Sequence, residues 1–70
     1  MSDLTRKPED DIVDRDTVLA YVRQYPGQRV QEGQLKQATG VNKAIIRRLL
    51  RDVPGIDQQL LEQGEVRWTG

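Results

Sequence analysis

Basic side chains recur at helical spacing within one short stretch of the chain. Lys43, Arg47 and Arg51 lie four residues apart, and Arg48 lies beside them. Residues four apart occupy the same face of an α-helix, so these cations would form one stripe. Residues 36–51 contain five basic side chains and no acidic one. Such a stripe is typical of a surface that binds a polyanion, and also of a helix face that is simply solvated.

Side chains that catalyse reactions or bind transition metals are scarce. The 70 residues include no histidine and no cysteine, which removes the commonest general bases, nucleophiles and metal ligands. The one dense carboxylate cluster, Glu9-Asp10-Asp11, lies in a segment with no expected scaffold to fix its geometry. No glycine loop has the spacing that cradles phosphate. We therefore expect a protein that is not an enzyme and that uses no cofactor and no metal.

The net charge of zero hides a division within the chain. Residues 1–16 carry six acidic and three basic side chains, a balance of −3, whereas residues 17–70 carry five and eight, a balance of +3. Residues 1–15 also hold few large apolar side chains, so we predict an acidic disordered arm there, with Ile12 and Val13 as candidates for docking on the domain. The simplest interpretation of the arm is a tail that increases solubility. The alternative is that its carboxylates compete with a polyanion for the basic stripe.

The basic stripe needs a helix to carry it, and residues 16–70 are predicted to form one domain with three helices. Asp16 is suited to cap a first helix over residues 17–25, which Pro26 ends. A second helix is expected over residues 31–39, and Gly40 is suited to end it in a left-handed conformation. The residues expected to face the core from these two helices are Val18, Leu19, Val22, Tyr25, Leu35 and Ala38.

The third helix has the clearest amphipathic pattern in the chain. Asn42 is suited to cap a helix over residues 43–52, and Pro54 follows its end. At 100° per residue, an aliphatic row lies opposite the basic stripe. The row consists of Ile45, Ile46, Leu49 and Leu50.

The tail allows two interpretations. Asp57 is suited to cap a helix, and Leu60 and Leu61 follow it at helical spacing, which favours a short fourth helical turn. The alternative is a strand that leads into a hairpin. Residues 65–68 alternate like a strand that could pair with residues 28–30. Trp68 is expected to cover the core rather than to serve as a stacking platform.

Residues 35–50 resemble the helix-turn-helix superfamily, and more specifically small bacterial winged-helix DNA-binding domains. In that family an inward leucine and alanine precede a glycine turn, a hydrophobic residue, a polar cap and a helix with an aliphatic row. The residues that fit these places are Leu35, Ala38, Gly40, Val41, Ile46 and Leu50. The resemblance covers about residues 16–68 and implies a mainly α fold with a small β element, a three-helix core of winged-helix type.

The resemblance also implies a site. In that family the third helix enters the major groove of double-stranded DNA with its N-terminal part toward the bases. Asn42, Lys43, Arg47 and Arg48 would then be the candidates for base contact, since asparagine pairs with adenine and arginine with guanine. The side chains expected to meet phosphates are Lys36, Arg51, Arg29 and Arg67. This chain departs from the family at Gly33 inside the second helix and in a wing that carries Glu62 and Glu65.

Two functions remain open on the sequence. The first is a small transcriptional regulator of the bacterial cytoplasm that binds DNA through its third helix. Its few phosphate contacts would give weak binding, so a homodimer or a protein partner is expected, through the first helix or through Leu60 and Leu61. The second is a winged-helix adaptor that binds protein and not DNA, favoured by the acidic arm and the zero net charge. No apolar run is long enough for a membrane span.

Overall fold

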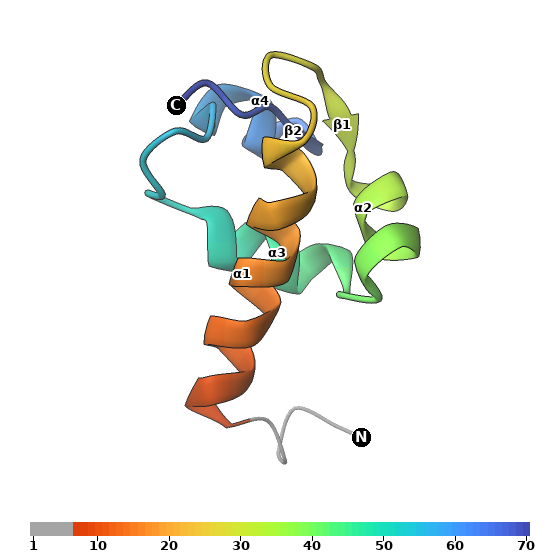
Figure 1. Ribbon diagram of the computed structural model, residues 1–70, viewed down its shortest axis with the longest axis vertical. Coiled ribbons are helices and arrows are strands. Elements are labelled where there is room, and N and C mark those ends of the chain that lie inside the picture. Colours follow the sequence, from red (N-terminus) through yellow and green to blue (C-terminus); the bar gives the residue numbers. More distant parts are fainter. Residues whose placement is uncertain (1–6) are drawn as a thin grey trace.

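The computed structural model describes residues 7–70 and is mainly helical (Figure 1). Helices α1, α2 and α3 pack around a core, and a two-stranded antiparallel sheet and a short helix α4 close one end. None of the helices in this part of the chain combines the length and apolar character that crossing a bilayer requires. The elements in chain order are α1 (Pro8–Arg23), β1 (Val30–Gln31), α2 (Glu32–Thr39), α3 (Lys43–Leu50), α4 (Gln58–Glu62) and β2 (Glu65–Val66).

Helix α1 begins well before the predicted start. It is continuous from Pro8 to Arg23, so the prediction of a disordered arm is wrong for residues 8–15, and residues 1–6 lie outside the described residues. Asp16 lies inside the helix and does not cap it.

Local end effects explain the early start of α1. Proline with its fixed φ suits the first helical position, and the carboxylates of the first turn interact favourably with the helix dipole. The Lys7 N–H also donates to Asp10 Oδ2 at 3.0 Å. This part of the helix therefore depends on end effects and not on apolar burial.

The core lies where α1 crosses α2 and α3. Val18 and Val22 of α1 are fully buried, as are Leu35 of α2 and Ile46 of α3. The predicted burial of Ala38 and Tyr25 is wrong, because both side chains are exposed, Tyr25 at 38%. The other buried core residues are Leu19, Val30, Val41, Leu50, Ile56, Leu61 and Val66.

The turn between α2 and α3 has the predicted form. Gly40 is left-handed with φ 77°, and its N–H donates to the carbonyl of Lys36 at 2.7 Å. Val41 is buried, and the Asn42 side-chain oxygen accepts from the N–H of Ala44 at 2.9 Å. Helix α3 therefore begins at Lys43 as predicted, although it ends at Leu50 rather than at residue 52.

The tail contains both the short helix and the strand. Asp57 caps α4 by accepting from Gln59 and Leu60, which confirms the fourth helical turn. Strand β2 pairs with β1, with Val66 opposite Val30. Leu60 and Leu61 are buried, 7% and 3% exposed, so the prediction that they form a surface for a partner is wrong.

The segment that follows β2 lies between two others. On one side the N–H of Gly27 donates to the carbonyl of Trp68 at 2.9 Å. On the other side Ile56 and Trp68 form an antiparallel bridge, and the N–H of Asp57 donates to the carbonyl of Arg67 at 3.2 Å. The chain thus runs from residues 55–57 through α4 and returns antiparallel to itself.

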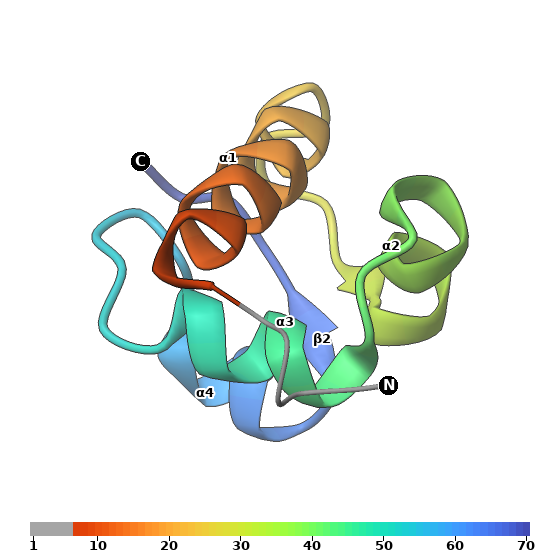
Figure 2. The same cartoon turned by 90° about the horizontal axis from the view of Figure 1, so that it is seen from below.

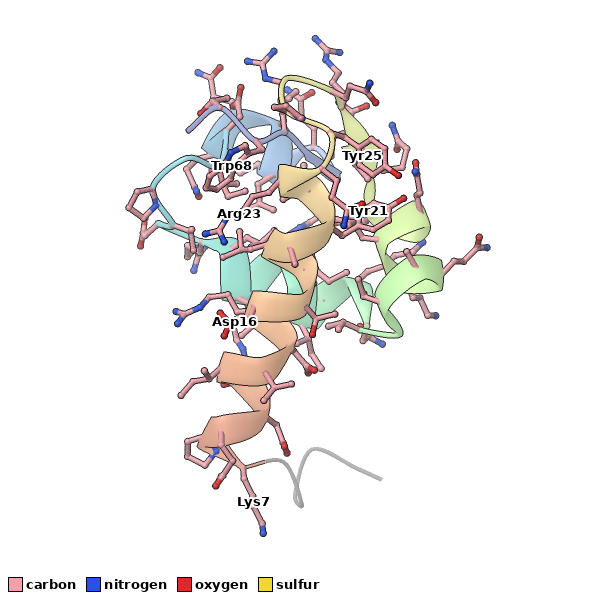
Figure 3. All side chains as sticks on the ribbon, in the orientation of Figure 1. Lys7, Asp16, Tyr21, Arg23, Tyr25 and Trp68 are labelled. Atoms are coloured by element: carbon pink, nitrogen blue, oxygen red, sulfur yellow. The ribbon has the colours of Figure 1, made fainter. Side chains whose placement is uncertain are left out.

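Trp68 covers the core, as expected. Its ring packs against the core, and the guanidinium of Arg23 faces the ring, 4.9 Å from the ring centroid (Figure 3). Gly55 lies under the same ring, and a Cβ at this position would stand 2.8 Å from two ring carbons. A glycine is required at residue 55 both for this contact and for its φ of 91°.

Candidate nucleic-acid interface

The outer face of α3 gathers the basic side chains around a shallow hollow. The amphipathic pattern of α3 turns Ile46 and Leu50 inward and leaves its cations on the surface. The small side chain of Ala44 is exposed and lies within this face. The hollow has a volume of about 410 Å³ and is lined by Glu32, Lys43, Ala44, Arg47, Arg48 and Arg51.

Arg47 is held by a carboxylate that the sequence prediction did not consider. Glu32 Oε2 accepts from Arg47 Nε at 3.2 Å and lies 3.1 Å from Nη2. The Glu32 side chain is only 13% exposed, whereas that of Arg47 is 52% exposed. The pair joins the first residue of α2 to the outer face of α3 and puts one negative charge into the wall of the basic hollow.

Arg48 is paired with a carboxylate of α1. Its Nη2 donates to Asp11 Oδ1 at 3.1 Å and to Oδ2 at 3.4 Å. The two side chains are 61% and 39% exposed, so water screens this pair more than the pair of Arg47. In Figure 2 α1 is seen obliquely from its N-terminal end and lies beside α3, which it contacts. The acidic segment therefore touches the basic face, although as part of a helix and not as a disordered arm.

Lys43 and Arg51 line the hollow from the start and from the end of α3. Neither forms an ion pair within residues 7–70, and both are exposed. Asn42, next to Lys43, uses its side-chain oxygen to cap α3, which leaves its amide as a donor to a ligand. Lys43 and Arg51 are consequently the cations of this face that are most available to an anion.

The structure does not bring every predicted cation to the hollow. Lys36 is exposed on α2 and does not line it. Arg67 bonds Asp57 Oδ2 at 2.7 Å beside the tail, and Arg29 lies 3.9 Å from Glu65 on the sheet. The interface therefore gathers Lys43, Arg47, Arg48 and Arg51, and leaves Lys36, Arg29 and Arg67 apart.

The residues that the prediction missed are Glu32 and Asp11. They are 15 and 37 residues from their arginine partners, so no helical spacing connects them.

Within residues 7–70 no group of histidine, cysteine, aspartate and glutamate is arranged to hold a metal ion. No protein-family model matches this chain, and searches of curated proteins and of solved structures found no match either.

Proposed function

We propose that the chain is a DNA-binding helix-turn-helix module of winged-helix type, a small transcriptional regulator of the bacterial cytoplasm rather than an enzyme. Helix α3 would lie in the major groove of double-stranded DNA. Lys43, Arg47 and Arg48 would face base edges, with the Asn42 amide beside them, and Arg51 would meet the phosphate backbone. Lys36 would add a second phosphate contact from α2.

One observation carries the proposal: four cations surround an open hollow on a single exposed helix face. A solvated helix face would be equally charged, but it would not need the small exposed Ala44 among the residues that line the hollow, which lets a groove or a base edge approach the backbone of α3. Two of the cations are free of ion pairs in residues 7–70, so an incoming phosphate has no internal competitor there.

The order of the elements supports the winged-helix type. One helix, a short strand, two helices joined by a glycine turn and a returning tail follow one another in the order that the resemblance implies. The tail departs from a simple wing, because α4 occupies the connection between residues 55–57 and β2. With Arg67 bonded to Asp57 and Glu62 exposed on α4, the tail offers little to phosphate, so α3 carries the binding.

The binding of one copy to DNA would depend strongly on salt. Each phosphate contact contributes a slope of about −0.9 to log K against log salt, so the contacts of Arg51 and Lys36 predict a slope of about −2. We predict that Arg51→Ala lowers the magnitude of this slope by about 0.9 and weakens binding to all duplexes alike. The measurement is fluorescence anisotropy of a random-sequence duplex between low and moderate salt.

Arg15→Ala is the matched control, because Arg15 is an exposed helical arginine that forms no ion pair within residues 7–70 and does not line the hollow. It removes the same charge and is expected to leave the slope unchanged. Equal losses for the two variants would mean that only the total charge matters. No binding of the unchanged protein at low salt would contradict the proposal itself.

A protein-binding adaptor is the second candidate, and one observation favours it. Ile12 and Val13 on α1 are 54% and 61% exposed, the largest exposures among the large apolar residues described. The same surface would serve a homodimer or a protein partner of a DNA-binding module. An adaptor would keep its protein partner in Arg51→Ala and lose it in Ile12→Ser. A DNA-binding monomer would bind DNA more weakly in Arg51→Ala and bind it unchanged in Ile12→Ser.

A further inference from the structure

We propose that Glu32 is a positioning residue that holds Arg47 in the one orientation that reads a guanine; this inference rests on the proposed DNA binding. The pair would then make Arg47 a reader of base identity, whereas Arg48 and Arg51 would add affinity without strong sequence preference.

The residue Glu32 is held by the turn that follows α4, through both its backbone and its carboxylate. Its backbone N–H donates to the carbonyl of Gly64 at 3.1 Å, which ties the start of α2 to the turn after α4. A Cβ at Gly64 would stand 3.3 Å from Glu32 Oε1, so the carboxylate is packed against this turn. The glycine, with φ 87°, leaves the space in which the carboxylate lies.

The fixed carboxylate binds one edge of the Arg47 guanidinium and leaves another edge exposed. Oε2 takes the Nε hydrogen at 3.2 Å and lies 3.1 Å from Nη2. A guanidinium has five N–H donors in a rigid plane, so Nη1 and the second hydrogen of Nη2 remain for a ligand. Two parallel donors of this kind match the O6 and N7 acceptors of guanine in the major groove.

The exposures separate this pair from that of Arg48. Arg47 is 52% exposed toward the hollow while its partner is 13% exposed, so one side chain is anchored and the other is presented. In the Arg48 pair both side chains are more than one third exposed, at 61% and 39%. Arg48 can therefore leave Asp11 and meet whichever acceptor lies nearest, a phosphate or a base.

The opposite effects of Glu32→Ala on affinity and on selectivity make it a sharp test. Loss of one negative charge beside the hollow steepens the slope of log K against log salt by up to about 0.9, so random duplex binds more tightly at low salt. Loss of the anchor frees Arg47, and the guanine preference at one position falls by about tenfold. The experiment selects from a pool of duplexes with a randomised core, and sequences the retained fraction for each variant.

Asp11→Ala is the matched control, because it removes one carboxylate from Arg48 with the same change in charge. It is expected to raise affinity for random duplex and to retain the guanine enrichment. Should Glu32→Ala lose its helical circular dichroism, Glu32→Gln replaces it, with a smaller loss of enrichment because the amide oxygen still accepts from Arg47.

The outcomes separate the two proposals. Enrichment of guanine by the unchanged protein and by Asp11→Ala, with its loss in the Glu32 variant, supports the positioning role. The positioning role is overturned if the Glu32 variant shows the same enrichment. It is also overturned if the unchanged protein retains duplex without any base enrichment. Both results remain consistent with DNA binding. Failure of the unchanged protein to retain any duplex at low salt overturns the proposed function, and this inference with it.

Discussion

The two halves of α1 form one continuous helix, but different forces hold them in that conformation. In residues 17–23 the helix buries Val18, Leu19 and Val22, which are 0%, 6% and 0% exposed. In residues 8–16 its large apolar side chains, Ile12 and Val13, are more than half exposed, and this half projects beyond the core (Figure 1). Packing maintains the second half, and capping, the helix dipole and one ion pair to α3 maintain the first.

The largest expected effect comes from truncating a buried residue of the second half. Leu19→Ala removes core contacts and leaves a cavity, so the free energy of unfolding should fall by about 2–5 kcal/mol. Urea denaturation followed by circular dichroism measures this loss. Ile12→Ala in the first half is the control and should change the free energy of unfolding by less than about 0.5 kcal/mol. Similar losses for both variants would mean that packing stabilises the two halves of α1 to the same extent.

A proline in the first half should have an intermediate and local effect. Proline in a helix interior usually costs about 3 kcal/mol, because it removes a hydrogen bond and clashes with the preceding turn. In Ile12→Pro the turn before residue 12 can unwind without exposing the core, so the loss on global unfolding should be about 1 kcal/mol or less. Hydrogen exchange should become fast at residues 11, 13 and 14, whose N–H groups lose their carbonyl acceptors, and stay slow at Val22. A cooperative loss of protection throughout α1 would contradict this independence.

The smallest expected effect concerns the cap of the first half. Asp10→Ala removes the acceptor of the Lys7 N–H and one carboxylate of the first turn. Such losses cost about 0.5–1 kcal/mol. Here the cost should appear as fraying, seen in the NMR secondary shifts of residues 8–12, with the urea midpoint nearly unchanged. Asp16→Ala, in the interior of the helix, is the control and should leave these shifts as they are.

Sequence signals predicted the fold where they act over a few residues. Gly40 and Asn42 specify the turn before α3 through a left-handed glycine and a side-chain cap, and Asp57 specifies the start of α4 in the same way. The start of α1 does not follow from apolar burial over residues 8–15, because end effects at Pro8 and Asp10 set it.

The candidate site was predictable only in part, for a related reason. The cations of α3 share a helix face, which periodicity along the sequence reveals. Their carboxylate partners come from α1 and α2, and only tertiary packing brings Asp11 and Glu32 to that face. For the same reason, spacing alone could not separate Lys43 and Arg51, which lie at the hollow, from Lys36 and Arg67, which lie elsewhere.

The packing of Trp68 between Gly55 and Arg23 makes the intrinsic fluorescence of the protein sensitive to the position of the tail. Trp68 is the only tryptophan in the sequence, so its fluorescence comes from one place, where the returning tail meets the end of α1. Detachment of the tail would expose the indole to water and move its emission to longer wavelength. A ligand at the outer face of α3 would leave that emission unchanged, so a shift to longer wavelength reports detachment of the tail and not occupancy of the basic hollow.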